Sequence, residues 1–178
     1  MTTEFTYRLA VETDIPYIRI LMRNAITELQ SDFLSPAQIE ASFAVMGLDS
    51  QLIEDGTYYV VEGLGHIVAC GGWSYRNTLF GGDHTDGRDL TPLDPAKNAA
   101  RIRGMYTHPL WVRQGLGRMV LELCEKAAGD AGFKHLKMGA TLSGEKLYQA
   151  YGYSVEEYFE ATAPSGITIP LVKMRKTI

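Results

Sequence analysis

A glycine-rich stretch in the second half of the chain carries the clearest chemical signal in the sequence. It reads Val112-Arg113-Gln114-Gly115-Leu116-Gly117-Arg118 and leads directly into a segment with helical apolar spacing. The first amides of a helix lack intrahelical partners and the helix dipole is positive there, while glycines let the backbone approach a ligand closely. The two arginines and Gln114 add side-chain donors beside those amides. The stretch therefore predicts a binding site for a diphosphate or a similar anion.

The pattern differs from two common nucleotide-binding loops. No Gly-Lys-Ser/Thr follows, which excludes a Walker P-loop, and Val120 occupies the position of the third glycine in a dinucleotide-binding fingerprint. Taken alone, Gly-x-Gly is equally compatible with a tight strand-to-helix turn that binds nothing. The surrounding motifs have to decide between these alternatives.

In its wider context the chain resembles the GNAT superfamily of acetyl-CoA-dependent N-acetyltransferases. That family's signature is Gln/Arg-x-x-Gly-x-Gly/Ala after a strand and a proline, and here the preceding strand ends Met105-Tyr106-Thr107-His108-Pro109. A downstream family motif, Leu/Phe-Tyr-x-x-x-Gly-Phe, is similar to Leu147-Tyr148-Gln149-Ala150-Tyr151-Gly152-Tyr153. The opening Arg8-Leu9-Ala10 and Asp14-Ile15 are similar to the family's first strand and helix. The resemblance spans nearly the whole chain in the right order.

The resemblance implies a fold, a reaction and a set of site residues. The fold would be a single α/β (mixed α+β) domain over residues 1–178, with a central mixed, mostly antiparallel sheet flanked by helices. The enzyme would transfer acetyl from its cosubstrate acetyl-CoA to a primary amine by direct attack, without a metal, and Tyr148 would protonate the departing thiolate. A backbone amide near Met105 or Tyr106 would stabilise the developing oxyanion. The residues implied in binding acetyl-CoA are Met105, Tyr106, Thr107, Arg113, Gln114, Gly115, Leu116, Gly117 and Arg118.

Two positions depart from the family pattern. Val112 stands where the motif has Gln or Arg, and the neighbouring Arg113 can supply the lost donor. Arg101 stands where many members carry a glutamate that acts as general base, so that role cannot be transferred to this chain. Besides loss of the amine's proton to water, the candidates for removing it are Glu62, His84 and His108.

Hydrophobic periodicity places these motifs on a mixed fold with a strand–helix–strand crossover near residues 99–141. Asp14 is expected to cap a first helix, and Ser35-Pro36-Ala37-Gln38 predicts a capping box at the start of a second. A long polar loop is expected over residues 76–97. The predicted strands cover residues 4–10, 57–62, 66–75, 98–107, 134–141, 153–161 and 167–174, with later helices over 115–131 and 145–150.

The resemblance implies that the long loop and the first two helices contact the acceptor. The spacing of Asp83, His84, Asp86 and Asp89 fits neither a calcium loop nor a zinc site, so a solvated loop is expected. Arg101 and Arg103 share one strand face, where they would bind an anionic group of the substrate or form surface salt bridges. The residues that would line an acceptor pocket are Trp73, Tyr75, Arg76 and Phe80.

Composition limits the class of protein. A formal net charge of −4 and the absence of a basic run disfavour a nucleic-acid role. No apolar stretch approaches the roughly 20 residues of a membrane span, and no secretory signal is recognisable, so a cytoplasmic location is expected. Cys70 and Cys124 lie in apolar runs and predict buried free thiols.

The acceptor stays open at this point: a small amine, an amino acid, or an amine of a peptide or protein. A homodimer is compatible with the sequence, which does not require one. The rival functions are transfer of another acyl group, transfer to a hydroxyl, or non-catalytic sensing of CoA. Thiol release from acetyl-CoA over a panel of amines distinguishes an enzyme from a sensor.

Overall fold

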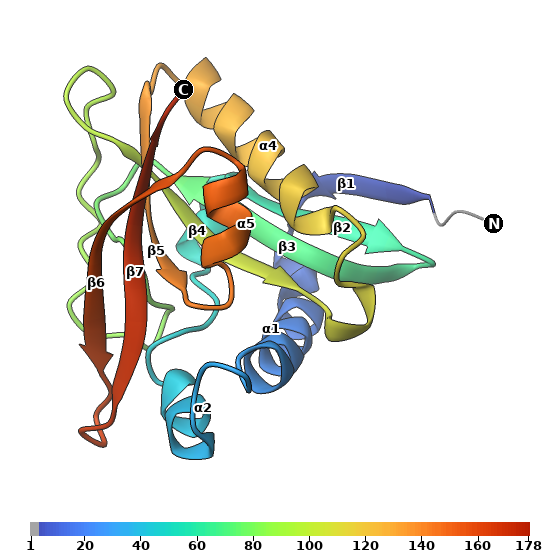
Figure 1. The fold of residues 1–178 in the computed structure, drawn as a ribbon. Helices are drawn as coiled ribbons and strands as arrows, with labels where there is room; N and C mark the ends of the chain where they lie inside the picture. Colours follow the sequence, from blue (N-terminus) through green and yellow to red (C-terminus); the bar gives the residue numbers. More distant parts are fainter. Residues whose placement is uncertain (1–3) are drawn as a thin grey trace.

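The computed structural model describes residues 4–178, which form a seven-stranded sheet with helices on both faces (Figure 1). The sheet order is β1-β2-β3-β4-β5-β7-β6, and only the β4–β5 pair is parallel within the described residues. This confirms the expected mixed, mostly antiparallel sheet. The strands are β1 (Phe5–Leu9), β2 (Tyr58–Gly63), β3 (His66–Ser74), β4 (Ala100–Thr107), β5 (His135–Thr141), β6 (Ser154–Thr162) and β7 (Thr168–Thr177).

The helices that start at Ile15, Pro36, Leu116 and Glu145 begin at or next to the predicted residues, whereas the short helix Gln51–Glu54 was not predicted. The Ser35 hydroxyl accepts from the Gln38 amide at 3.2 Å, which confirms the capping box. The expected cap at Asp14 is wrong, because its carboxylate instead accepts from Arg8 at 2.7 Å and from the Val11 amide at 2.8 Å. The helices are α1 (Ile15–Leu29), α2 (Pro36–Ser42), α3 (Gln51–Glu54), α4 (Leu116–Asp130) and α5 (Glu145–Ala150), with 3-10 turns at Glu12–Asp14 and Pro109–Trp111. None of these helices has the length and apolar character needed to cross a bilayer.

Alternating side chains of the central strands supply two cores, one on each face of the sheet. Val61 faces α4, where it joins Val120 and Cys124, whereas the preceding Val60 faces α1 and packs with Ile18 and Leu21. Both cysteines are buried and free, as predicted, and burial raises the pKa of the Cys70 thiol to about 12. A third cluster joins the end of α1 to β7 through Ile26, Ile169 and Leu171.

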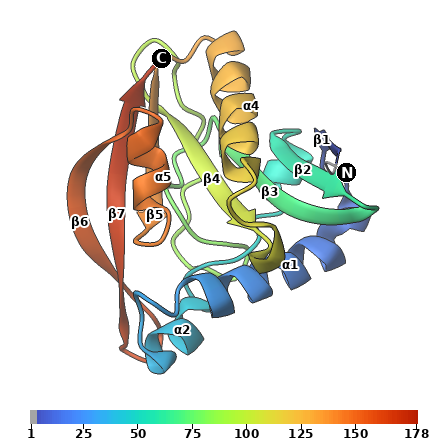
Figure 2. The same ribbon diagram turned by 45° about the vertical axis from the view of Figure 1, so that its right-hand side comes forward.

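The two halves of the sheet separate along β4 and β5. These strands pair only at Ala100↔Leu136 and Arg101↔Lys137, although β5 stays paired with β7 from His135 to Thr141. Figure 2 shows the strands spreading apart, with α5 on one side of the opening and α1 below it. The β5-facing edge of β4 beyond Arg101 is therefore left without a neighbouring strand.

Candidate active site

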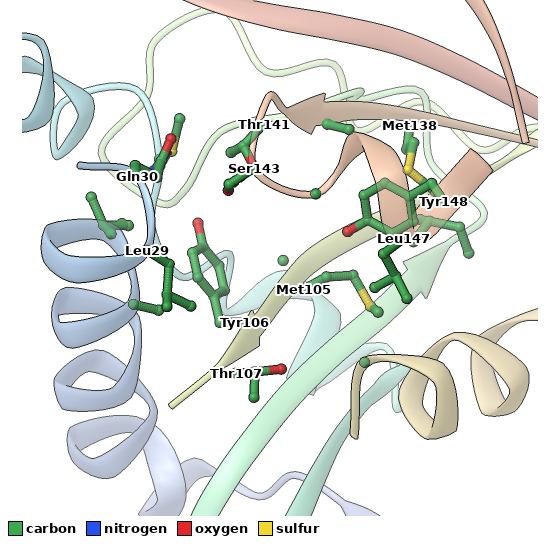
Figure 3. Close-up of a pocket in the computed structure, with 18 of the residues that line it drawn as sticks. Leu29, Gln30, Met105, Tyr106, Thr107, Met138, Thr141, Ser143, Leu147 and Tyr148 are labelled. Carbon is green, nitrogen blue, oxygen red and sulfur yellow. Dashed lines mark hydrogen bonds between the residues drawn. The ribbon is translucent and has the colours of Figure 1, made fainter. Parts of the chain in front are cut away.

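A cavity of about 780 Å³ occupies the region where β4 and β5 diverge. Its walls come from α1, β4, β5, α5 and the loop that leads into α4. The site therefore draws on segments far apart in the sequence, and Figure 3 shows their side chains converging on one space.

The open edge of β4 exposes main-chain groups to this cavity. Tyr106 is paired with Cys70 of β3, and the His108 amide donates to the Val68 carbonyl at 2.9 Å. Because peptide groups alternate sides along an antiparallel strand, those of Met105 and Thr107 point away from β3, toward the gap. The amide of Met105 therefore faces the gap, whereas that of Tyr106 faces β3.

The loop before α4 presents a run of unpaired amides. Gly115 precedes the helix with φ +80°, and Arg113 also has a positive φ of +64°. The first amide to find a backbone acceptor is that of Met119, which donates to the Gly115 carbonyl at 3.0 Å. The amides of residues 113–118 make no hydrogen bond to the rest of residues 4–178. Such a concave run of N–H groups at a helix N-terminus binds anions.

The side chains of this loop differ in whether they have a partner. Arg113 and Gln114 are exposed and form no hydrogen bond within residues 4–178. Arg118 is engaged with Glu122 at 2.6 Å and lies 5.5 Å from the centre of the Tyr151 ring. Of the two motif glycines, Gly117 is the one where a side chain would clash, since a Cβ there would lie 2.9 Å from the end of the Leu147 side chain.

Tyr148 on α5 combines a buried ring with an available hydroxyl. The residue is 7% exposed, and its ring packs edge-on against Tyr153 with 6.0 Å between centroids. Within residues 4–178 its hydroxyl has no hydrogen-bond partner, and Figure 3 shows the oxygen pointing into the cavity near Met105. Burial raises the pKa of this phenol above its ordinary value, so the hydroxyl stays protonated.

None of the three predicted base candidates lies in the cavity. Glu62 pairs with Arg8 at 2.8 Å on the outer strands, and His84 packs against Gly47. His108 accepts from the Leu110 amide at 3.2 Å, just outside the lining. The described lining contains no Asp, Glu or His side chain. The charges that do line it are Arg103, Arg113, Arg118 and Lys146.

The predicted acceptor residues are mostly structural. Trp73 is buried against Phe133, with 6.0 Å between ring centroids, and Tyr75 packs on the same core. Arg76 binds Asp55 at 2.7 Å, so Phe80 alone of the four lines the cavity in the described chain.

The two strand arginines serve structural roles in different surroundings. Arg101 donates to the Ala99 carbonyl at 2.8 Å and to Asn77 at 2.9 Å, without a salt bridge within residues 4–178. The surface salt bridge expected at Arg103 is wrong, because Arg103 is 4% exposed and pairs with the buried Asp49 at 3.0 Å. The overlying loop buries this side chain through carbonyl contacts that strand periodicity does not encode.

The first two helices were expected near the acceptor, and the end of α1 and the segment after α2 do form a cavity wall, but sequence reasoning named none of its residues for this role. Gln30 carries a signal, since it falls on the apolar helical spacing of Ile18, Met22 and Ile26 yet is polar. The long loop holds no group of three or more metal-ligating side chains in its described residues. Asp83 instead accepts from Ser50 at 2.9 Å, and Asp89 accepts from Asn77 at 2.7 Å.

Comparison with known proteins agrees with this geometry. A model of the acetyltransferase (GNAT) family matches residues 23–153, which is most of the chain. The chain also superposes on a GCN5-related N-acetyltransferase from Rhodopseudomonas palustris with a TM-score of 0.73 and 18% identity, over 100% of this chain and 99% of that one. No curated protein matches the chain.

Two further solved structures hold coenzyme A or acetyl-CoA. The PaiA N-acetyltransferase of Thermoplasma acidophilum, in complex with coenzyme A, gives a TM-score of 0.66 at 12% identity over 98% of this chain and 99% of that one. A phosphinothricin acetyltransferase from Sinorhizobium meliloti, in complex with acetyl-CoA, gives 0.64 at 18% identity over 100% and 89%. These likenesses show the fold, and the family match identifies the chain as a member of the GNAT family, an N-acetyltransferase that uses acetyl-CoA.

Proposed function

We propose that this enzyme transfers acetyl from acetyl-CoA directly to a primary amine, with Tyr148 as the general acid. One observation carries the proposal. The unpartnered Tyr148 hydroxyl opens into a cavity that is also lined by Arg113 and residues 115–118, whose amides are unpaired, and by the free edge of β4. A proton donor, an anion site and an open strand edge are the parts that acetyl transfer from a long, phosphate-bearing thioester requires.

The anion site is assigned to the diphosphate of the cosubstrate. Amides of Arg113, Gln114, Gly115, Leu116, Gly117 and Arg118 donate to it, and the exposed Arg113 and Gln114 side chains add donors. The outward peptide groups of Met105 and Thr107 pair with the amides of the pantetheine arm as an added strand would. Tyr106 contributes its side chain to the cavity wall.

In the transfer, acetyl-CoA supplies an activated thioester, and the chain positions and polarises it. The amine's lone pair forms a bond to the carbonyl carbon while the carbon–sulfur bond breaks. The Met105 amide donates to the carbonyl oxygen as negative charge develops there, and the Tyr148 hydroxyl gives its proton to the departing sulfur. Holding both reactants in one cavity replaces a collision by a local step.

The amine loses its proton to water in this scheme. The described cavity wall carries no carboxylate or imidazole to accept it. A thiolate that takes the proton of Tyr148 leaves a phenolate, which recovers a proton from the same water. Because no side chain of the described wall can deprotonate an ammonium group, the reactive form is the neutral amine that is already present in solution.

Thermal stability with acetyl-CoA tests the binding site. At a ligand concentration of about 100 times Kd, linkage adds about 2.7 kcal/mol, which raises the Tm of a protein of this size by about 5–10 °C. Gly117→Leu places a side chain in the cavity wall beside Leu147 and is expected to abolish this shift. Gly129→Leu makes the same change on an exposed turn of the same helix and is expected to keep it.

Thiol release over an amine panel tests the reaction. Turnover with at least one amine supports the transferase, and acetyl-CoA binding without turnover on any amine supports a sensor instead. An unchanged thermal shift in Gly117→Leu contradicts the binding assignment, whatever the turnover.

A further inference from the structure

The two ends of the cavity differ in charge. Arg113, Arg118 and Lys146 are exposed at the end nearest α4 and α5, which suits a ligand rich in phosphate. At the other end, Arg103 is the charged lining residue, and it is buried. The acceptor is expected at this second end, and the charge that it meets there depends on whether Arg103 is free to pair with a substrate.

Arg103 is already neutralised. Its Nη2 donates to Asp49 at 3.0 Å and to the Gly81 carbonyl at 2.6 Å, and its Nη1 donates to the Thr78 carbonyl at 3.2 Å. Asp49 is itself held by Arg88 at 2.6 Å. The ion pair leaves neither an available cation for a substrate carboxylate nor an available anion for a second ammonium group.

The rest of the acceptor end is apolar, apart from neutral hydrogen-bonding groups. Its apolar wall is formed by Ile26, Leu29, Phe33, Val45, Met46 and Phe80.

The Gln30 side chain is the main polar group in that wall. The residue is 5% exposed, and within the described chain its Nε2 donates only to the Met46 sulfur, at 3.4 Å. Its carbonyl oxygen receives no hydrogen bond from residues 4–178. Figure 3 shows Gln30 across the cavity from Thr141 and Ser143, with the Tyr106 hydroxyl pointing into the same space.

We propose that the acceptor is a primary amine on an apolar body, such as an arylalkylamine or alkylamine, with no second charged group. The inference rests on the proposed acetyl transfer. A carboxylate or a second ammonium at this end would lose its hydration without gaining a counter-charge, which strongly disfavours binding. An apolar body gains from burial against the wall, and the open oxygen of Gln30 accepts a hydrogen bond from an N–H of the amine.

Matched amines test this directly. We would compare 2-phenylethylamine with phenylalanine, and pentylamine with 1,5-diaminopentane, as kcat/KM corrected for the fraction of neutral amine. The compounds without a second charged group, 2-phenylethylamine and pentylamine, are expected to have a kcat/KM about 100-fold higher than their partners. The reason is that burying an unpaired charge weakens binding by at least this factor. Charged members that react as fast as their partners would overturn the inference while leaving the acetyl transfer intact. Absence of thiol release with all four amines would also overturn the inference, and the wider amine panel then decides whether the transfer itself occurs.

An isosteric exchange at Gln30 supplies a second test. Gln30→Glu places a carboxylate in the acceptor end and is expected to lower the preference for pentylamine over 1,5-diaminopentane by about tenfold or more. Gln30→Met keeps the volume without a charge and is expected to keep the preference within about threefold of the wild type. A preference unchanged in a folded Gln30→Glu variant, as judged by its Tm, would contradict this placement of the acceptor. The wild-type panel decides the matter if that variant does not fold.

Discussion

Replacing Tyr148 with phenylalanine separates its chemical role from its packing role. The ring packs against Tyr153 with 6.0 Å between centroids and belongs to the core next to α4. Phenylalanine keeps that ring and leaves no cavity. The hydroxyl has no hydrogen-bond partner within residues 4–178, so its removal breaks no internal bond.

The expected effects on stability and rate therefore diverge. The free energy of unfolding should change by less than about 1 kcal/mol, because neither packing nor a hydrogen bond is lost. The kcat should fall by about 10²–10⁴-fold, the usual contribution of a general acid, which corresponds to about 2.7–5.4 kcal/mol of transition-state stabilisation. The KM for acetyl-CoA should stay within about threefold, since the hydroxyl acts on the departing sulfur and not on the bound diphosphate.

The assay is thiol release at saturating acetyl-CoA, with a Tm for each variant. Tyr153→Phe is the matched control, because Tyr153 lies in edge contact with Tyr148 but its hydroxyl is buried in the core without a partner among residues 4–178. Removing that buried hydroxyl should leave kcat unchanged and leave stability equal or slightly higher. A Tyr148→Phe enzyme with a kcat within threefold of the wild type, or a Tyr153→Phe enzyme equally impaired, would refute the assignment of the acid.

Three other expectations concern pH and backbone geometry. Because burial raises the pKa of Tyr148, kcat/KM should climb with pH as neutral amine accumulates, and rate measurements should show no decline below about pH 10. Gly115→Ala and Gly65→Ala both force alanine into a left-handed conformation, with φ +80° and +77°, so thermal melts should show a similar cost of about 1–2 kcal/mol. Only Gly115→Ala should also weaken acetyl-CoA binding. Hydrogen bonding by Arg8 lowers the pKa of Asp14, so the ionised carboxylate stabilises the folded state above about pH 4 and this contribution is lost as pH falls further. In thermal melts, the Tm of Asp14→Asn should therefore approach that of the wild type in acid.

Local signals in the sequence predicted much of the fold. The capping box at Ser35, the hairpin of β2 and β3, and the glycine that precedes α4 each depend on residues only a few positions apart. Such preferences act on the backbone before any long-range contact forms. Asp14 shows their limit, because a partner on β1 removed its carboxylate from the helix end.

The candidate site likewise has a part that local sequence predicted and a part that depends on long-range contacts. The motifs around Gly115 and around Tyr148 were visible because each consists of contiguous residues, although the acid role of Tyr148 was implied only by the family resemblance. Apart from Phe80, Gln30 and the residues of the apolar wall were not, since their proximity to β4 depends on how the two halves of the sheet separate. Arg103 looked like a surface residue because strand periodicity assigns a face but does not say what covers that face.

By itself, the sequence determined the family, the mixed sheet with its crossover helix, and the stretch that presents unpaired amides. Tertiary structure alone decided which charges are available to a substrate, by pairing Arg103 with Asp49 and by keeping Glu62, His84 and His108 out of the cavity. The reason is that backbone conformation follows from neighbouring residues, whereas the electrostatic character of a cavity depends on every chain segment that folds around it.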